Sequence, residues 1–332
     1  MKPVLSIVVP AYNEAEGLAQ FHRRLQGVLD GVGLSAEILF VNDGSSDATR
    51  AVLDAIRSED SRVAIVDLSR NFGKEIALTA GLDHALGDAV VVIDADLQDP
   101  PELIPTLIER WREGYDVVYA RRTRRTGESL LKKTTAKVFY RIMAGIGSTA
   151  IPTDTGDFRL LSRRAVDALT RLRERHRFMK GLFSWIGYRQ VAVEYVREPR
   201  FTGNTKWNYW KLWNFAIEGF TSFTIAPLKI ATYIGVSTAA AAFVYATGII
   251  VRTIVHGRDV PGYASLMVAV LFLGGIQLMS LGVLGEYVGR MFNETKGRPL
   301  YLIHEYLPAR HVPLGDQPGP ALSQTIDGNS LR

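Results

Sequence analysis

The sequence predicts an α/β domain with a mostly parallel sheet, followed by two helices long enough to cross a membrane. Up to residue 120, short runs of β-branched and other apolar residues alternate with stretches of helical periodicity. Such alternation is typical of right-handed β-α-β units, which place helices on both faces of a parallel sheet. Farther along, Ile230–Val251 and Val260–Gly285 contain no Asp, Glu, Lys or Arg, which is unusual for the core helix of a soluble protein.

The expected elements of the α/β domain follow one another in a regular order. The strands are Leu5–Val9, Ala36–Val41, Val63–Leu68, Ala89–Ile93 and Val117–Ala120, and the helices between them are Glu16–Leu29, Ala48–Arg57, Glu75–Ala85 and Pro101–Trp111. Asp47 directly precedes the second helix, and we expect its side chain to cap that helix. No G-x-G-x-x-G fingerprint follows the first strand and no Walker A sequence occurs, so dehydrogenases and P-loop ATPases are disfavoured.

The two charge-free ranges predict a transmembrane hairpin with spans at about residues 230–251 and 262–285. Each is long enough to cross a hydrocarbon core of about 30 Å as a helix. The connector between them is short, so both flanks lie on one side of the membrane. Lysine and arginine are more numerous in the flanks, and the positive-inside rule therefore places the large domain and both termini in the cytoplasm, at an inner or plasma membrane.

The chain accordingly divides into four parts. We expect a cytoplasmic catalytic domain at 1–200, an interfacial helix region at 201–228, the two spans within 229–289 and a cytoplasmic tail at 290–332. Residues 129–148 combine an apolar helical face with a basic one, as in a helix that lies in the membrane interface. Trp207, Trp210 and Trp213 resemble an interfacial aromatic belt. A core-facing helix or an oligomer contact is the alternative for both segments.

The net charge of +5 indicates an anionic partner. Basic residues concentrate between Arg121 and Arg125, close to the amphipathic segment, and no zinc-finger, homeodomain or RNA-recognition signature accompanies them. We therefore expect the membrane surface and phosphate groups, rather than nucleic acid, as partners. A merely solvated or lipid-facing basic run is the alternative.

Two aspartates at the end of the fourth strand limit the chemistry most sharply. The run from Val90 to Ile93 is followed at once by Asp94 and Asp96, and ligands of parallel sheets bind at the carboxyl ends of the strands. Oxygen ligands at this spacing suit Mg²⁺ or Mn²⁺, which takes one or two carboxylates and leaves its other positions to water and substrate phosphates. The pattern predicts a nucleotide-linked substrate, and capping of the helix near Pro101 is the alternative.

The segments at the strand ends resemble the leading motifs of family 2 glycosyltransferases. These segments are SIVVPAYNE at 6–14, VNDGSSD at 41–47 and DADLQDPPE at 94–102. The likeness continues through RNFGK at 70–74, TGDFRL at 155–160 and RFTGNTKW at 200–207, and it extends from Leu5 to about Pro308. More narrowly, the chain is similar to the polyprenyl-phosphate glycosyltransferases, the group of dolichol-phosphate mannose synthase and bactoprenol glucosyltransferase.

This resemblance implies a Rossmann-like glycosyltransferase A-type domain and a role for individual residues. The nucleotide would be held by Pro10, Tyr12, Glu14, Asp43, Asp94 and Lys74, and the metal, Mg²⁺ or Mn²⁺, by Asp94, Asp96 and Gln98. Phosphates and acceptor would be held by Arg122, Arg125, Arg200 and Lys206, and the catalytic residues would be Asp157, Asp96 and Arg122.

Structural roles are alternatives for several of these residues. Lys74 could neutralise Glu75 or a helix end, and Asp157 could cap a turn or pair with Arg159. Arg200 and Lys206 could extend to lipid head groups without binding substrate.

The reaction implied by the resemblance is inverting, metal-dependent transfer of one sugar to a polyprenyl phosphate, such as undecaprenyl phosphate, at the cytoplasmic leaflet. UDP-glucose is the first choice of donor; GDP-mannose, UDP-N-acetylglucosamine, UDP-galactose and a UDP-aminoarabinose derivative are alternatives. A lipid monophosphate is largely a dianion at pH 7, so we expect Asp157 to orient the metal or the acceptor rather than to remove a proton. A homo-oligomer, with a tetramer as one form, is also implied. A catalytically silent membrane adaptor or lipid-binding subunit is the alternative from another class.

Overall fold

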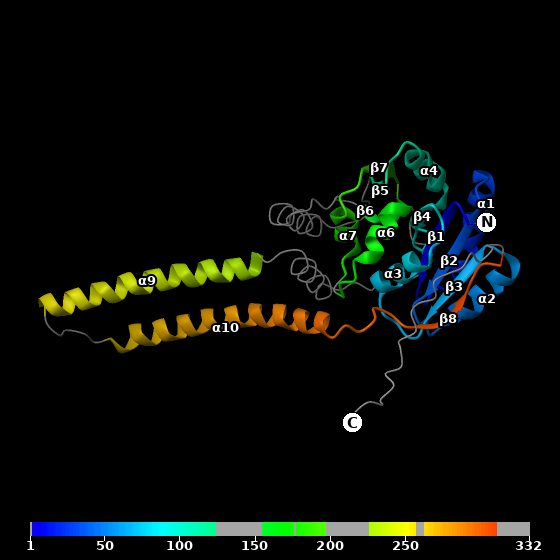
Figure 1. Cartoon of the computed structure of the whole chain (residues 1–332). Coiled ribbons are helices and arrows are strands. Elements are labelled where there is room, and N and C mark those ends of the chain that lie inside the picture. Colours follow the sequence, from blue (N-terminus) through cyan, green and yellow to red (C-terminus); the bar gives the residue numbers. More distant parts are fainter. Residues whose placement is uncertain (1, 124–154, 176, 197–225, 257–261, 311–332) are drawn as a thin grey trace, which may run out of the picture.

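The computed structural model describes residues 2–123, 155–175, 177–196, 226–256 and 262–310. These residues form an α/β domain and, projecting from it, a pair of long helices (Figure 1). The described strands make one sheet of eight, in the order β7-β5-β6-β4-β1-β2-β3-β8. The α/β fold predicted from the sequence is confirmed.

One half of the sheet consists of strands that the sequence predicted. They are β1 (Leu5–Ala11), β2 (Ala36–Asn42), β3 (Val63–Leu68) and β4 (Ala89–Val92), which pair in parallel in the order β4-β1-β2-β3. All four are apolar and almost entirely buried, because helices cover both faces of the sheet. Their carboxyl ends therefore lie along the same edge. We call these four strands the parallel half.

The other half of the sheet has mixed direction, and we call it the mixed half. In it β5 (Val117–Arg122) runs parallel to β7 (Gln190–Tyr195), whereas β6 (Thr155–Ser162) lies antiparallel between β4 and β5. Of these three strands, the sequence predicted only β5. Because β6 runs in the opposite direction, its first residues lie beside the last residues of β4 and β5. The start of β6 is thereby brought to the edge where the parallel strands end.

Two hydrophobic cores lie on opposite faces of the sheet. One face is covered by α1 (Leu18–Val32), α2 (Thr49–Glu59) and α4 (Ile104–Arg112), the last preceded by the short 3₁₀ helix Pro101–Leu103. The other face is covered by α3 (Lys74–His84), α6 (Arg163–Arg171) and α7 (Met179–Trp185). Successive residues of β1 contribute to different cores, as Ile7 and Val8 illustrate.

The second helix begins one residue later than predicted, so its N-cap is Ala48, which makes no side-chain cap bond. Asp47, one residue farther out, still accepts the backbone N–H of Thr49, the first residue of α2, at 2.9 Å. Its Oδ2 accepts the N–H of Ala15 at 3.3 Å, so the same side chain also ties the loop after β1 to the start of α2.

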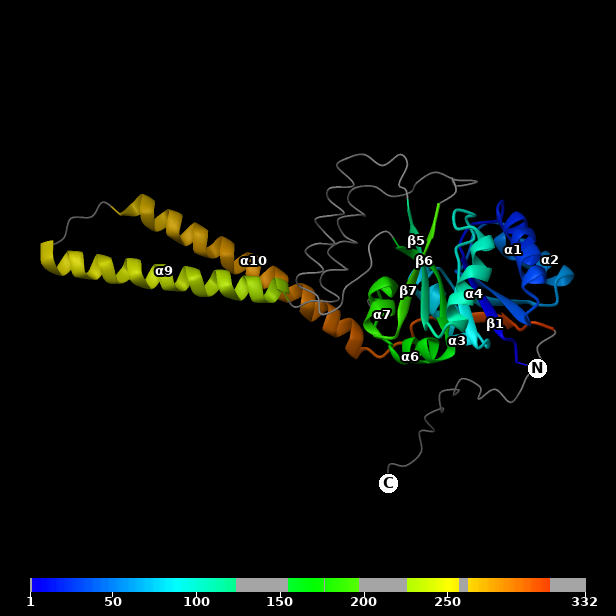
Figure 2. The same ribbon diagram turned by 90° about the horizontal axis from the view of Figure 1, so that it is seen from above.

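The helices α9 (Ala226–His256) and α10 (Tyr263–Thr295) lie side by side and project away from the sheet (Figures 1 and 2). Both are long and apolar enough to cross a membrane, over Ile230–Val255 and Leu266–Thr295. Most large apolar side chains described along them are exposed. The second helix continues well beyond the span end expected at about residue 285. Its last turn contacts the α/β domain, where Glu294 Oε1 accepts the N–H of Arg175 at 2.7 Å.

After the hairpin the chain returns to the sheet. The strand β8 (Ile303–Leu307) pairs antiparallel with β3 and forms one edge of the sheet. Glu305 on β8 forms an ion pair of 2.6 Å with Arg50 of α2. This strand lies within the segment 290–332 that we expected to be a tail. Its partner is far away in the sequence, so no local pattern reveals the pairing.

Candidate active site

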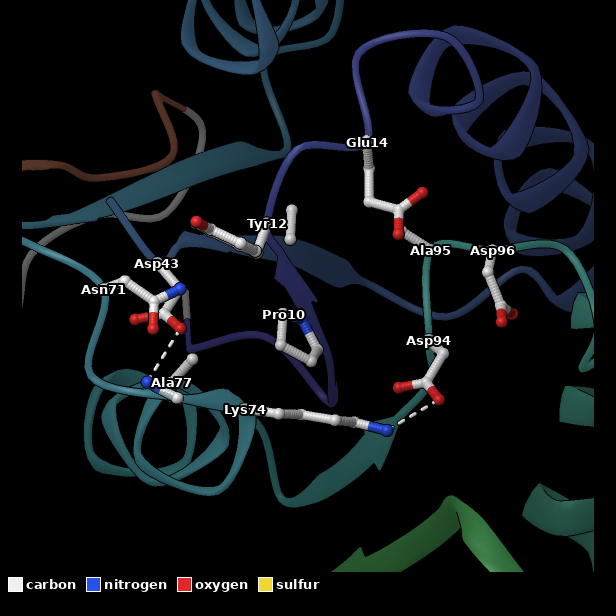
Figure 3. A pocket seen from close by; sticks show the side chains of 12 residues that line it. Pro10, Tyr12, Glu14, Asp43, Asn71, Lys74, Ala77, Asp94, Ala95 and Asp96 are labelled. Atoms are coloured by element: carbon white, nitrogen blue, oxygen red, sulfur yellow. Dashed lines mark hydrogen bonds and ion pairs between the residues drawn. The ribbon is translucent and has the colours of Figure 1, made fainter. Parts of the chain in front are cut away.

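A pocket of about 230 Å³ opens at the carboxyl ends of β1, β2 and β4. Figure 3 shows its side chains converging from these strand ends and from the start of α3. The lining combines an aromatic ring, four carboxylates, one lysine and small residues: Pro10, Ala11, Tyr12, Glu14, Asp43, Asn71, Gly73, Lys74, Ala77, Asp94, Ala95 and Asp96. All the residues that we predicted to hold the nucleotide therefore meet in one pocket, and Asn71, Gly73 and Ala77 are additions that the sequence did not single out.

The loops that follow β1 and β2 hold each other in place. Asn13 lies in the left-handed region, with φ 55°, which asparagine tolerates better than most residues. Its side-chain oxygen accepts the N–H of Ser46 at 2.9 Å, and Ser45 Oγ accepts the N–H of Asn13 at 3.0 Å. These hydrogen bonds fix the loop from which Tyr12 and Glu14, the neighbours of Asn13, line the pocket. Tyr12 is 43 % exposed.

Asp43 shapes the pocket through the loop that precedes α3. Its buried carboxylate accepts the N–H of Phe72 at 2.7 Å and that of Gly73 at 2.9 Å. Burial raises the pKa of Asp43 even though both hydrogen bonds act in the opposite direction. Gly44 next to it has φ 62°, and a Cβ there would lie 2.3 Å from the carbonyl carbon of Arg70. The contact of Asp43 with a nucleoside stays a prediction, since its oxygens already bond this loop.

Lys74 joins the two halves of the sheet at the site. Its Nζ lies 2.7 Å from Asp94 Oδ2, at the end of β4, and 2.6 Å from Asp157 Oδ2, near the start of β6 (the former contact is drawn in Figure 3). Neither a Lys74–Glu75 nor an Asp157–Arg159 side-chain ion pair occurs among the described residues, but the charge of Lys74 acts on Glu75 and that of Arg159 on Asp157. Lys74 is 45 % exposed at its side chain, whereas that of Asp157 is only 10 % exposed.

The three charges shift one another's pKa values. Desolvation disfavours the ammonium, but the two carboxylates raise the pKa of Lys74 above its ordinary value. Burial opposes ionisation of Asp157 as well, yet Lys74, Lys180 and Arg159 hold the pKa of Asp157 below its usual range. For Asp94 burial prevails and its pKa is raised. Asp157 is therefore a carboxylate at neutral pH and a poor acceptor for a proton.

The loop after β4 directs its acids into the site by an unusual backbone conformation. Leu97 has φ 59°, which is uncommon for a residue other than glycine. Asp96 on one side of it lines the pocket, and its Oδ1 accepts the N–H of Gln98 at 3.1 Å. This bond stabilises the loop itself. The 3₁₀ helix at Pro101 and the helix α4 after it begin without a side-chain cap hydrogen bond, so the capping alternative for Asp94 and Asp96 is not supported.

A second group of charges lies near Asp157; the sequence analysis named its members, Arg159 and Glu75, only as possible structural partners. Arg159 is buried, stacks over the Phe183 ring at 3.7 Å and donates to the backbone oxygen of Gly156 at 2.7 Å. Burial lowers the pKa of Arg159 to about 10. Burial, together with the Asp157 charge, raises the pKa of Glu75 to about 7. The Glu75 side chain accepts the N–H of Met179 at 3.1 Å, which ties α3 to α7.

Arg122 is oriented by two buried partners from other elements. Its Nε donates to the hydroxyl of Tyr195 on β7 at 3.2 Å, and its Nη2 lies 3.9 Å from Asp99 Oδ1. The Tyr195 hydroxyl in turn donates to Asp99. Burial and the Asp99 carboxylate raise the pKa of Tyr195, so this hydroxyl keeps its proton. A Cβ on Gly156 would lie 2.8 Å from Arg122 Nη2, so glycine at that position leaves room for the guanidinium.

The residues at the pocket suit a hard divalent cation. The described residues contain no group of three or more His, Cys, Asp or Glu arranged to hold a metal. Asp94 and Asp96 nevertheless supply carboxylates at the pocket, and the buried Oδ1 of Asp157 has no hydrogen-bond partner among the described residues. An unpartnered carboxylate oxygen beside another acid is a favourable place for a cation. The donor set therefore fits Mg²⁺ or Mn²⁺.

Several predicted residues lie outside the described part of the chain. These are Arg125, Arg200 and Lys206, together with the amphipathic segment 129–148 and most of the interfacial region 201–228. Their roles stay predictions. Asp99, Tyr195, Arg159 and Lys180 are site residues that the sequence analysis did not select. Asp99 and Arg159 stand within motifs that it recognised, whereas Tyr195 and Lys180 carry no local signal.

The fold and the pocket are those of an α/β protein with an acid-lined pocket at its strand ends and a C-terminal pair of helices long and apolar enough to cross a membrane. Comparison with protein families makes this specific: residues 6–170 match glycosyl transferase family 2, and residues 226–291 match the GtrB C-terminal hairpin. The chain belongs to glycosyltransferase family 2 and is associated with a membrane through its hairpin.

The curated relatives are similar over nearly their whole length. The chain is 55 % identical over 310 residues to an uncharacterized glycosyltransferase of Synechocystis, covering 93 % of this chain and 98 % of the relative. It is 49 % identical over 299 residues to the prophage bactoprenol glucosyl transferase homolog of Escherichia coli K12, covering 90 % of this chain and 98 % of the relative. The same identity and coverage apply to the bactoprenol glucosyl transferase of Shigella phage SfX.

Proposed function

We propose that this chain transfers glucose from UDP-glucose to a polyprenyl phosphate, such as undecaprenyl phosphate, at the cytoplasmic face of a membrane. The observation that carries this proposal is the 49 % identity to a bactoprenol glucosyl transferase over 90 % of this chain and 98 % of the relative. The likeness includes both the pocket and the hairpin, so it covers a donor site and a means of reaching a lipid acceptor.

The donor nucleotide would occupy the pocket at the ends of β1, β2 and β4. Tyr12 offers an exposed ring against which a base can stack, and Glu14 offers acceptors for hydroxyl or base N–H groups. Asp43 would act mainly by fixing the loop of Phe72 and Gly73. A rigid pocket lowers the cost of ordering the nucleotide on binding.

Mg²⁺ or Mn²⁺ would be held by Asp94 and Asp96, with Gln98 as the further predicted ligand. A bound divalent ion would stabilise the negative charge that develops on the leaving diphosphate. The guanidinium of Arg122 would act on phosphate oxygens in the same way, because Tyr195 and Asp99 fix its direction before the substrate arrives.

In the proposed reaction, a phosphate oxygen of the lipid forms a bond to the anomeric carbon of the sugar. The bond from that carbon to the diphosphate breaks, and the electron pair leaves with the nucleoside diphosphate. A single displacement inverts the anomeric centre. The lipid phosphate is largely a dianion at neutral pH and needs no base, which agrees with the lowered pKa of Asp157. Asp157 would orient groups at the reacting centre.

The hairpin would hold the domain at the bilayer so that the acceptor can enter from the lipid. The segments that flank the hairpin and both termini would lie in the cytoplasm. The protein would also form homo-oligomers, for example a tetramer.

The test is transfer of radiolabelled sugar to undecaprenyl phosphate in liposomes, from a panel of UDP- and GDP-sugars, with Mg²⁺, with Mn²⁺ and with chelator. We expect one labelled lipid, formed from UDP-glucose and only with metal. Transfer from another donor would correct the sugar and keep the reaction. Absence of transfer from every donor, with lipid and nucleotide both bound, would favour the adaptor alternative.

A further inference from the structure

Lys74 occupies an unusual place for a positive charge. It is the first residue of α3, directly after Gly73 with φ 96°, and the amino end of a helix carries partial positive charge that disfavours a cation. What compensates the ammonium is not its own helix but Asp94 at 2.7 Å and Asp157 at 2.6 Å, from two other elements. Its ion pairs, and not helix formation, account for a lysine at this position.

The carboxylates that Lys74 neutralises are those that a metal would otherwise attract. Asp94 is one of the proposed metal ligands, and the second oxygen of Asp157 has no hydrogen-bond partner among the described residues. A divalent cation that approaches these acids meets an ammonium already bound to both. Two cations at one pair of carboxylates repel each other strongly at short range, so the metal and the bound ammonium exclude one another.

The surrounding charges make the exchange of cations depend on the donor. The acids at Lys74 already have basic partners, since Lys74, Lys180 and Arg159 act on Asp157 and Lys74 acts on Asp94. A metal ion alone that takes Asp94 and Asp157 would leave the Lys74 ammonium without an anionic partner. A metal ion that arrives with a diphosphate gives the released ammonium a new anionic partner in the same pocket.

Exposure decides which of the groups can move. The Lys74 side chain is 45 % exposed and long, and it lines the pocket, whereas the Asp157 side chain is 10 % exposed and belongs to a strand within the sheet. A flexible lysine can turn toward the pocket with little rearrangement. The carboxylates stay in position.

We propose that Lys74 is a displaceable internal cation. In the donor-free enzyme Lys74 forms ion pairs with Asp94 and Asp157. When the divalent ion binds, it displaces the Lys74 ammonium, which then pairs with the diphosphate of the nucleotide. The binding of the metal and the binding of the donor therefore strengthen each other. The proposal rests on the metal and nucleotide of the proposed function, but not on the identity of the sugar or the lipid.

The first experiment measures the Kd of Mn²⁺ for the full-length protein in detergent, with and without UDP. In the wild type, UDP should tighten Mn²⁺ binding by about tenfold or more, a coupling of ordinary size for linked sites. In Lys74→Met the Mn²⁺ affinity without UDP should rise, and the effect of UDP should shrink to a few-fold at most. Mn²⁺ binding that is unchanged or weaker in Lys74→Met would overturn the proposal.

Lys180→Met is the matched control. It removes the same charge from the neighbourhood of Asp157, but Lys180 forms no ion pair among the described residues. A smaller gain in Mn²⁺ affinity than in Lys74→Met supports displacement, and an equal gain overturns it in favour of a general effect of net charge. If neither Mn²⁺ nor UDP binds the wild type, the proposed metal site fails together with this inference.

A second measurement needs no variant. The wild-type protein is treated with an amine-reactive acylating reagent, and the modification of Lys74 is followed by mass spectrometry, with Lys2 at the surface ion pair to Asp88 as the internal reference. Mn²⁺ at a concentration well above its measured Kd should increase the rate at Lys74 relative to Lys2, because the released ammonium loses both carboxylates. An unchanged or lower rate would overturn the proposal. Failure of sugar transfer with both readouts as expected would count against the proposed function alone.

Discussion

The parallel half of the sheet and the mixed half contribute to the site in opposite ways. Loops of the parallel half line an accessible pocket, and Tyr12 and Lys74 there are nearly half exposed. The mixed half contributes Asp157, which is buried, and Arg122, which is partly buried, and both are already bonded to other side chains. The parallel half is therefore arranged to receive a ligand, whereas the mixed half holds its charged side chains in fixed orientations before any ligand binds.

The largest expected effect lies in the parallel half. Asp96→Ala should reduce sugar transfer by at least about 10³-fold, because it removes a carboxylate proposed to hold the metal that stabilises the leaving diphosphate. The rate of labelled-lipid formation at saturating substrates measures it, and the melting temperature should stay close to that of the wild type. Asp88→Ala, at a surface ion pair with Lys2, is the control. Most of the activity surviving in Asp96→Ala would remove this residue from the metal site.

The next prediction tests whether the fixed orientation of the Arg122 guanidinium, in the mixed half, matters for substrate binding. Arg122→Lys keeps the charge but loses the planar donor that contacts Tyr195 and Asp99, and we expect KM for donor or lipid to rise by about 10- to 100-fold. Initial rates over a range of both substrates give the two KM values. Arg121→Lys is the matched control, since the Arg121 side chain pairs with exposed Glu194. Equal kinetics of the two variants would show that the orientation of the Arg122 guanidinium does not affect substrate binding.

Two glycine substitutions distinguish an effect on substrate binding in the mixed half from an effect on stability in the parallel half. Gly156→Ala places a methyl group 2.8 Å from Arg122 Nη2, the flexible end of a side chain, so KM should rise several-fold with little change in melting temperature. Gly44→Ala places its methyl 2.3 Å from the backbone of Arg70, at φ 62°, so the protein should lose stability, by more than about 1 kcal/mol. Kinetics and thermal melting of both variants are compared. The reverse pattern would contradict the assignment of these glycines.

The smallest expected effect concerns the pH dependence of stability. Burial, with the nearby Asp157 charge, raises the pKa of Glu75 from its ordinary 4.5 to about 7. The folded protein thus binds the Glu75 proton more tightly than the unfolded chain does. Stability gained from this proton is present below about pH 4.5 and is lost as pH rises toward 7.

Glu75→Gln should remove this dependence, because the amide cannot ionise and its oxygen can still accept the N–H of Met179. Between pH 5 and 8 the melting temperature of the wild type in detergent should therefore fall relative to that of Glu75→Gln. Glu113→Gln, at an exposed ion pair with Arg110, is the control. Parallel curves for wild type and Glu75→Gln would show that Glu75 ionises normally.

The sequence predicted the parallel half well because its signals are local. Apolar runs mark β1 to β4, and polar residues directly after them mark the pocket; Pro10, Tyr12, Glu14, Asp43, Asp94 and Asp96 accordingly all line it. The parallel pairing of β-α-β units brings such strand ends together whatever the details of packing. The charge-free helices were equally plain, since hydropathy alone defines them.

The contacts of the mixed half and the pairing of β8 could not be predicted from local sequence patterns. Nothing near Tyr195 in the sequence indicates that it meets Asp99 and Arg122, and nothing near Ile303 indicates that the chain returns to pair with β3. Arg159 stands in the motif TGDFRL and Lys180 in none, but for neither does the sequence show the burial that lowers its pKa.

The family, the α/β fold, the hairpin and the acids at the pocket could thus all be predicted from the amino-acid sequence. Which charges pair, and above all that Lys74 lies between Asp94 and Asp157, became visible only in the folded protein. Periodicity and strand ends are properties of neighbouring residues, whereas ion pairs and pKa shifts depend on burial and on distances between segments far apart in the chain.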